Sequence, residues 1–361
     1  MKQRLFLALV VLVMVSFSIV FRVDSTPPTP APAAEKSDSL RSIVQKQGFG
    51  IGTAVELSQI QKDAKYREVL IREFNLLVPE NAWKFNQIHP KRDRYNFTDV
   101  DALIDFAKAN NMQMRGHPLV WHYSLPQWVE YGNYTRDELI EILRNHIQTV
   151  VGRYRGQVAV WDVVNEIINR DGSWRDTIWL RKIGPEYIDM AFRWAHEADP
   201  QARLFYGDYS SEEVGQKSDG IYTMVAGMLQ RGVPINGIGF QAHLRLDYLP
   251  NLDSLAQNFE RFNKLGLEVQ FTELDITIHD SKGSKEERLA GQARAYADLL
   301  RVCRRAQKCT GYVTWGFTDR YTWIANTTGE LDAPLIFDQS YRPKPAYEAI
   351  KEVLMSETSQ D

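Results

Sequence analysis

The sequence contains few cysteines and little net charge. Only two Cys occur among 361 residues, and the formal net charge is −3. So small a negative charge gives no reason to expect a nucleic-acid partner, which needs a basic surface. Cys303 and Cys309 have no further Cys and no nearby His with which to complete a metal site. The chain must therefore take its stability from a core, and its 44% hydrophobic residues allow a large one.

A glycine-rich phosphate-binding loop is also missing. The first strand candidate, residues 48–54, begins Gly-Phe-Gly-Ile-Gly, and this spacing differs from the dinucleotide-binding fingerprint. An open, doubly wound sheet would be expected to carry that fingerprint after its first strand. We interpret these glycines instead as part of a tightly packed first strand.

The N-terminus has the pattern of a targeting segment. Lys2 and Arg4 precede an apolar run over residues 5–21, which is typical of a signal peptide. An uncleaved anchor is the alternative, because the run approaches the length of a spanning helix. We assign residues 1–25 to a signal peptide or signal anchor and residues 26–38 to a Pro/Ala-rich linker. Either assignment predicts a secreted or extracytoplasmic protein, attached to a membrane only through this segment.

Export bears on the two cysteines. Cys303 and Cys309 are close in sequence, and in an oxidising compartment they can form a disulfide. The loop it closes is short, so we expect local stiffening rather than a main source of stability.

From Ser39 onward, strands and helices alternate without a second linker. The predicted strands are residues 48–54, 76–79, 113–115, 158–164, 203–207, 237–240, 268–272 and 311–314. The predicted helices are residues 62–74, 100–110, 135–154, 185–198, 216–230, 252–265, 284–306 and 344–355. Eight strands alternating with helices predict an α/β fold, a (β/α)8 TIM barrel. We expect one catalytic domain over residues 39–356, a short tail over 357–361 and a monomer.

Residues 158–166 carry the strongest functional signal. The stretch reads Val-Ala-Val-Trp-Asp-Val-Val-Asn-Glu, an apolar strand that ends abruptly in Asn165-Glu166. A carboxylate without a partner is costly in a core, so Glu166 is expected at the C-terminal end of the strand, facing a cleft. The alternative is that Glu166 merely begins the next loop.

The same pattern returns at other predicted strands, and this favours the cleft. These strands end in Glu80-Asn81, His117, Asp208-Tyr209, Gln241 with His243, Glu273 and Trp315. In a barrel, all such ends converge on one mouth.

Two of the residues at this predicted mouth, Glu166 and Glu273, are carboxylates on the fourth and seventh strands. Two opposed carboxylates suggest glycosidic bond cleavage, with one group protonated and the other ionised. Their environments must then push their pKa values apart. His117 and His243 with a carboxylate would be an alternative metal site, but their spacing follows no familiar metal motif. We therefore predict neither metal nor cofactor.

The chain resembles the endo-β-1,4-xylanases of glycoside hydrolase family 10 from about residue 39 to 355. The resemblance rests on motifs found in order at the predicted strand ends: Pro-Glu-Asn at 79–81, Gly-His-Pro-Leu-Val-Trp-His at 116–122, Trp-Asp-Val-Val-Asn-Glu at 161–166, Gly-Phe-Gln-Ala-His at 239–243, Thr-Glu-Leu-Asp at 272–275 and Trp-Gly-Phe-Thr-Asp at 315–319. The specificity for xylose is implied by this resemblance alone.

The resemblance implies the catalytic roles. Glu166 would be the general acid/base and Glu273 the nucleophile of a retaining mechanism with a covalent glycosyl-enzyme intermediate. The substrate would be xylan or a xylo-oligosaccharide. Hydrolysis of another β-1,4-glucan, transglycosylation, or a sugar-binding barrel without catalysis are the alternatives.

The resemblance also implies roles for the residues around the catalytic pair. Asn165 would hold the 2-hydroxyl at the cleavage point, Gln241 would contact Glu166, and His243, with Asp275 behind it, would hydrogen-bond Glu273. The remaining residues would line the sugar cleft: Glu80, Asn81, Lys84 and His117 on the glycone side, Trp121, Trp315 and Trp323 around the cleavage point, and Tyr209 on the aglycone side.

Two stretches depart from the family pattern. Trp83 and Phe85 exchange bulk on either side of Lys84, and the loop after the fifth predicted strand has Gly207 and Ser210 where amide side chains often flank the Asp-Tyr pair. We expect these changes to alter subsite affinities, especially on the aglycone side.

Overall fold

The structure is a computed structural model that describes residues 39–45, 47–326 and 332–358. The predicted signal segment 1–25, the predicted linker 26–38 and residues 359–361 of the predicted tail lie outside the described residues. Within the described ranges, no helix combines the length and the apolar character needed to cross a membrane.

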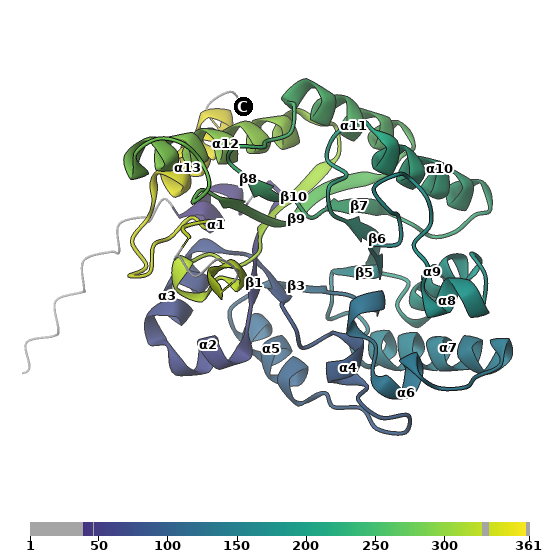
Figure 1. Ribbon diagram of the computed structural model, residues 1–361. Coiled ribbons are helices and arrows are strands. Elements are labelled where there is room, and N and C mark those ends of the chain that lie inside the picture. Colours follow the sequence, from purple (N-terminus) through teal and green to yellow (C-terminus); the bar gives the residue numbers. More distant parts are fainter. Residues whose placement is uncertain (1–38, 46, 327–331, 359–361) are drawn as a thin grey trace, which may run out of the picture. The chain divides into compact units, whose positions relative to one another are not determined.

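Eight parallel strands close into a barrel at the centre of the fold (Figure 1). They are β1 (Gly50–Val55), β2 (Leu76–Pro79), β3 (Gln113–Gly116), β5 (Val160–Asn165), β6 (Arg203–Asp208), β7 (Gly237–Phe240), β9 (Glu268–Thr277) and β10 (Cys309–Thr314). Neighbouring strands pair in sequence order, and β10 pairs with both β9 and β1. The last strand therefore closes the sheet onto the first, which confirms the predicted (β/α)8 barrel.

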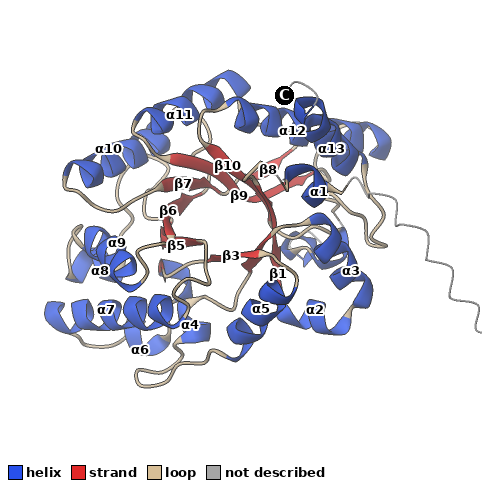
Figure 2. Cartoon of the chain, turned by 180° about the vertical axis from the view of Figure 1, so that it is seen from behind, coloured by secondary structure: helices blue, strands red, loops and turns tan. Residues whose placement is uncertain are grey.

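Helices surround the barrel in a ring, which is also visible from the opposite end (Figure 2). They are α1 (Leu40–Val44), α2 (Leu57–Lys62), α3 (Ala64–Glu73), α4 (Phe85–Ile88), α5 (Thr98–Ala109), α6 (Gln127–Glu130), α7 (Arg136–Arg153), α8 (Ile178–Lys182), α9 (Tyr187–Ala198), α10 (Gln216–Gln230), α11 (Leu252–Lys264), α12 (Lys285–Arg305) and α13 (Pro345–Thr358). Their apolar faces pack against the outside of the strands, as expected for a barrel of this class.

Several element boundaries differ from the prediction for local reasons. The helix predicted over residues 62–74 is α3, over Ala64–Glu73, which begins later than predicted because the Asp63 carboxylate accepts the N–H groups of Lys65 and Tyr66 at 3.0 Å and caps it. The helix α2 that precedes it was not predicted. The helix predicted over residues 100–110 begins two residues earlier, at Thr98, with Phe97 as its N-cap. The last helix continues to Thr358, two residues into the segment assigned to the tail.

Two short strands extend the barrel at its C-terminal end. β4 (Val120–Trp121) pairs with the end of β5, and β8 (His243–Arg245) pairs with the end of β9. The sequence analysis did not predict them. They matter because they fix Trp121 and His243 to the strands that carry Asn165 and Glu273.

The predicted disulfide is present. Cys303 near the end of α12 is bonded to Cys309 at the start of β10, six positions later. The bond ties a helix of the outer ring to the strand that closes the barrel.

Candidate active site

Glu166 stands directly after the last residue of β5 and is buried, with 6% of its surface exposed. Its backbone is left-handed, with φ of 58°, which is uncommon for a residue with a side chain. Its N–H donates to the carbonyl of Gly207 at 2.9 Å, and Arg175 Nε donates to its carbonyl at 2.8 Å. These bonds hold the turn that points the carboxylate away from the strand.

The Glu166 carboxylate is met by two amide side chains. Gln241 Nε2 donates to Glu166 Oε1 at 2.9 Å, and Asn165 Nδ2 approaches the same oxygen at 3.4 Å. Gly207 makes room for this arrangement, because a Cβ there would lie 2.7 Å from Asn165 Oδ1. The glycine that departs from the family pattern therefore fits closely against a predicted substrate-binding residue.

Glu273 lies within β9 and is 5% exposed. Its Oε2 is 3.3 Å from Nε2 of His243, and its Oε1 is 3.8 Å from Nε2 of His117. Its backbone N–H donates to the carbonyl of Gln241 at 3.1 Å. Gln241 therefore contacts both catalytic candidates, one through its side chain and the other through its main chain.

His243 lies between two carboxylates. Its Nδ1 is 2.9 Å from Asp275 Oδ2, while its Nε2 faces Glu273. Burial alone would lower the pKa of His243, but Asp275 and Glu273 outweigh it and raise the pKa well above 6.5. The raised pKa keeps a positive charge on His243, between Asp275 and Glu273.

Asp275 also positions an aromatic wall. Trp323 Nε1 donates to Asp275 Oδ2 at 2.8 Å, while 48% of the Trp323 surface remains exposed. Trp315 lies closer to the barrel axis, with its ring centroid 5.1 Å from that of His117. Two of the three aromatic residues that the sequence analysis placed around the cleavage point, Trp315 and Trp323, therefore lie beside His243, with ring centroids 6.3 and 5.1 Å from that of its imidazole.

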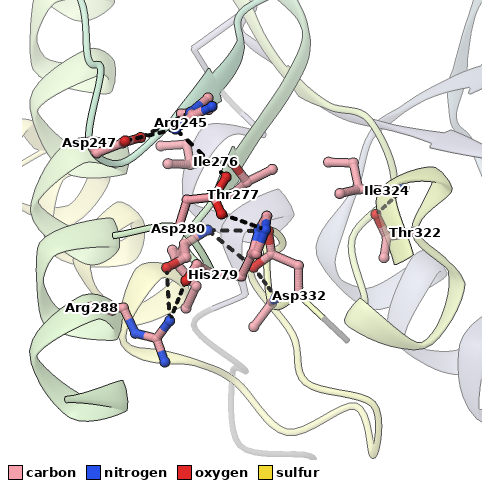
Figure 3. Close-up of polar contacts among 12 residues, drawn as sticks. Arg245, Asp247, Ile276, Thr277, His279, Asp280, Arg288, Thr322, Ile324 and Asp332 are labelled. Carbon is pink, nitrogen blue, oxygen red and sulfur yellow. Dashed lines mark hydrogen bonds and ion pairs between the residues drawn. The ribbon is translucent and has the colours of Figure 1, made fainter. Parts of the chain in front are cut away.

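Asp332 contacts the two residues that follow β9. The Asp332 carboxylate accepts the N–H of Ile278 at 3.1 Å and lies 3.3 Å from Nδ1 of His279 (Figure 3). Arg288 donates to the carbonyl of His279 at 2.8 Å from the neighbouring helix (Figure 3). Trp323 is therefore bonded to β9 itself, and Asp332 to the two residues that follow this strand.

The predicted glycone-side residues form a second polar group. Lys84 Nζ donates to Asn81 Oδ1 at 2.5 Å and lies 5.3 Å from the ring centroid of Trp121. Asn81 also donates to Glu56, a residue that the sequence analysis did not identify. Burial, together with the negative charge of Glu56, raises the pKa of Glu80 to about 7.

On the opposite side, Tyr209 is held by two cations. Arg175 donates to the Tyr209 hydroxyl at 2.9 Å, and Lys217 Nζ lies 3.4 Å from the ring centroid. Lys217 also pairs with the buried Asp208 at 2.7 Å. Burial raises the pKa of Asp208 to about 6 despite this partner, and the nearby charge of Glu166 adds to the effect.

The sequence analysis missed a charged pair beneath the site. Arg115 is fully buried and makes two hydrogen bonds to Asp162, which also accepts His117 Nδ1–H at 3.0 Å. The Asp162 contact leaves Nε2 of His117 facing Glu273, so His117, predicted on the glycone side, lies beside the predicted nucleophile. Charged residues inside predicted strands were the available signal, because they cannot be buried without partners.

A buried carboxylate also supports the turn after β7. Glu212 Oε1 accepts the N–H of Ala242 at 3.0 Å, and Ala242 is left-handed with φ of 59°. Burial raises the pKa of Glu212. This turn presents Gln241 and His243, so Glu212 positions two of the groups that contact the catalytic candidates.

Trp83 and Phe85 belong to the core rather than to a subsite. Both are fully buried, with Trp83 against Trp161 and Phe85 stacked on His146. Their departure from the family pattern is a change in packing beneath Lys84.

The described ranges contain no group of three or more His, Cys, Asp or Glu that is placed to hold a metal ion.

Comparison with known proteins agrees with this geometry. The model of the family described as glycosyl hydrolase family 10 matches residues 39–353. The chain is 42% identical to endo-1,4-beta-xylanase B of Thermotoga neapolitana over 318 residues, which cover 87% of this chain and 91% of that protein.

Two solved structures are similar over nearly the whole barrel. Native xylanase 10B from Thermotoga maritima has a TM-score of 0.86 and 44% identity, covering 90% of this chain and 100% of that one. Xylanase 10B from Thermotoga petrophila RKU-1 in complex with xylobiose has a TM-score of 0.85 and 44% identity, covering 88% of this chain and 98% of that one.

Proposed function

Because the chain belongs to glycosyl hydrolase family 10, we propose that it cleaves internal β-1,4-xylosidic linkages of xylan with retention of anomeric configuration. The observation that carries the proposal is the environment of its two strand-end carboxylates. Glu166 is met by neutral amides, whereas Glu273 faces the cationic His243. Two carboxyl groups with such unlike surroundings are suited to act as acid and nucleophile.

The proposed reaction proceeds in two displacements. Glu166 gives its proton to the glycosidic oxygen while Glu273 attacks the anomeric carbon, so that the carbon–oxygen bond breaks and a glycosyl ester forms. Water then attacks the same carbon, Glu166 takes its proton, and Glu273 leaves as a carboxylate. This mechanism requires the two carboxyl groups to lie about 5 Å apart.

The surrounding residues support the two steps. The imidazolium of His243 stabilises the Glu273 carboxylate before attack and after release. Asn165 has its side chain beside Glu166, and it would hold the 2-hydroxyl of the sugar. Trp121, Trp315 and Trp323 would wall the sugar, while Glu80, Asn81, Lys84 and Tyr209 would bind the chain on either side.

The experiment that tests the proposal is product analysis on purified linear xylo-oligosaccharides, combined with reducing-sugar release from xylan and from carboxymethylcellulose. We expect internal cleavage, an initial product of retained configuration, and a strong preference for xylan. Equal or greater release from carboxymethylcellulose would contradict the substrate, and an inverted product would contradict the mechanism.

We further propose that the protein acts outside the cytoplasm as a monomer, with residues 1–25 directing its export. The Cys303–Cys309 disulfide supports an oxidising compartment. Fractionation of the producing cells, with N-terminal sequencing of the recovered protein, tests export and separates a cleaved signal from a retained anchor.

A further inference from the structure

Glu56 stands where the first two strands of the barrel end side by side. In the register of β1 and β2, Val55 is paired with Pro79, and the N–H of Glu80 donates to the carbonyl of Val55 at 2.9 Å. Glu56 and the pair Glu80-Asn81 therefore directly follow two adjacent parallel strands. This position places Glu56 at the C-terminal mouth of the barrel, next to the proposed glycone residues.

The carboxylate of Glu56 does not serve the helix that it precedes. Glu56 is the N-cap residue of α2, but its side chain makes no capping hydrogen bond. Instead, Asn81 Nδ2 donates to Glu56 Oε1. Burial raises the pKa of Glu56, and the contacts with Asn81 and Lys84 offset this only in part. A half-buried carboxylate that caps no helix is thus turned toward a residue of the proposed sugar cleft.

The Asn81 amide is fixed at both ends by groups of opposite charge. Lys84 Nζ donates to Asn81 Oδ1 at 2.5 Å, while Glu56 accepts from Nδ2. An ammonium only donates and an ionised carboxylate only accepts, so exchanging the oxygen and nitrogen of the amide would lose both bonds. Among the described residues, Nδ2 donates to Glu56 alone, which leaves its second N–H for a ligand. Glu56, Asn81 and Lys84 form one hydrogen-bonded series.

This series leads from the end of β1 into the proposed sugar cleft. Lys84 Nζ lies 5.3 Å from the ring centroid of Trp121. Burial lowers the pKa of Lys84, and the charges of Glu273 and Glu166 are near enough to oppose that lowering. The last member of the series is therefore within electrostatic reach of both proposed catalytic carboxylates.

We propose that Glu56 is a positioning residue of the glycone side, which holds the Asn81 amide with its oxygen toward Lys84 and one N–H directed to a hydroxyl of the sugar. The inference rests on the proposed function, because the hydroxyl belongs to the xylosyl chain. Glu56 acts through Asn81 and does not itself bind the sugar. Without Glu56, the amide has to be ordered when the substrate binds, which weakens binding.

The test uses an aryl β-xylobioside, because its two sugars report the cleavage point and the glycone side without an aglycone sugar. At a pH well above 7, where Glu80 is ionised, we expect Glu56→Ala to raise KM roughly 5-fold with kcat nearly unchanged. Glu56→Gln keeps an oxygen that accepts from Asn81 and should recover most of this loss. An unchanged KM in Glu56→Ala would overturn the inference.

A double-mutant cycle separates positioning from a general structural effect. Because Glu56 acts through Asn81, Glu56→Ala should raise KM no further in a chain that already carries Asn81→Ala. Effects of the two substitutions that multiply as independent factors would overturn the role of Glu56.

The charge of Glu56 supplies a second measurement, the NMR titration of the Glu80 carboxyl group. Burial, together with the charge of Glu56, raises the pKa of Glu80 to about 7, so both Glu56→Ala and Glu56→Gln should move this titration to lower pH. The other titratable groups that face Glu80 remain in both variants: Tyr66, Lys84, Glu273 and His243. A titration that moves in neither variant would contradict the placement of Glu56 beside Glu80-Asn81.

The matched control is Glu68→Gln, which removes an exposed carboxylate of α3 that pairs with Lys65 at 2.9 Å. It should leave KM, kcat and the Glu80 titration unchanged. A wild-type protein inactive on both the aryl β-xylobioside and xylan would instead overturn the proposed function. Because this activity is measured before any variant is compared, the two failures are distinguishable.

Discussion

The side-chain amide of Gln241 donates a 2.9 Å hydrogen bond to Oε1 of Glu166. The backbone carbonyl of the same residue accepts the N–H of Glu273 at 3.1 Å. Both proposed catalytic residues are therefore hydrogen-bonded to Gln241, directly after β7. A shift of Gln241 would displace both of them. This relationship gives Gln241 two separable roles, and substitution of its side chain tests only one of them.

We expect Gln241→Leu to lower kcat/KM on xylan about 10-fold, which corresponds to roughly 1.4 kcal/mol of lost transition-state stabilisation. It should also lower the free energy of unfolding by roughly 1.5–3 kcal/mol, because it removes a buried hydrogen bond to a charged group. Gln241→Glu should be worse, since a second carboxylate would face Glu166. Steady-state kinetics and denaturant unfolding provide the measurements. Unchanged kcat/KM in Gln241→Leu would show that the contact has no part in catalysis.

The two carboxylates should respond differently to removal. Glu166→Ala should lower kcat/KM on xylan by roughly 10³-fold but retain much of the activity on aryl xylosides with good leaving groups, which need little protonation. Glu273→Ala should lose nearly all activity on both substrates, because it removes the group that forms the glycosyl ester. The measurement is the ratio of rates on the two substrates in each variant. Equal losses in Glu166→Ala would argue against an acid role.

The order of the barrel strands and the positions of the two proposed catalytic carboxylates were predictable from the sequence. Buried strands that end in polar residues are a local signal, and barrel closure then brings those residues to one mouth. Glu166, Gln241, His243 and Glu273 were found in this way, with roles supplied by resemblance to the family. The helix boundary at Asp63 was also encoded locally but was overlooked.

The supports beneath the site were not predictable in the same way. Arg115 and Asp162 are 47 positions apart and become partners only when β3 pairs with β5. Glu212 acts on Ala242 through a loop whose path the sequence does not determine. The burial of Trp83 was not predictable either, because its partner Trp161 lies in β5, far away in the sequence.

The charge of His243 should depend on Asp275. Because the pKa of His243 is raised in the folded state, its contribution to stability is present below pH 6.5 and is lost as the pH rises through the raised value. Asp275→Asn removes a carboxylate that raises this pKa. The stability contributed by His243 should therefore be lost at a lower pH in this variant. NMR titration of His243, with unfolding measured against pH, checks both effects.

The control for this change is Asp247→Asn, which breaks only the exposed pair with Arg245 shown in Figure 3. It should leave the His243 titration unchanged. A His243 titration that is also unaffected by Asp275→Asn would show that Glu273 alone sustains the imidazolium, and would remove Asp275 from the proposed electrostatic support.

The buried pair of Arg115 and Asp162 should contribute strongly to the free energy of unfolding. Arg115 is fully buried, makes two hydrogen bonds to Asp162 and a third to Gln270 at 2.7 Å, and lies over the Phe205 ring. Asp162→Ala would leave this guanidinium short of its counter-charge, so we expect a loss of about 3–5 kcal/mol in the free energy of unfolding. Asp298→Ala, which breaks the exposed pair with Arg301, should cost about 0.5 kcal/mol.

The pH dependence of this pair has a definite sign. Burial alone would raise the pKa of Asp162, but Arg115 and His117 outweigh it and the pKa is lowered. A lowered pKa contributes stability above the unfolded value, and this contribution is lost as the pH falls through the folded value. The wild type should therefore lose more stability than Asp162→Asn below about pH 4. An equal loss of stability in the two proteins as the pH falls would disprove the charge pairing, because the Asn variant has no proton to take up at this position.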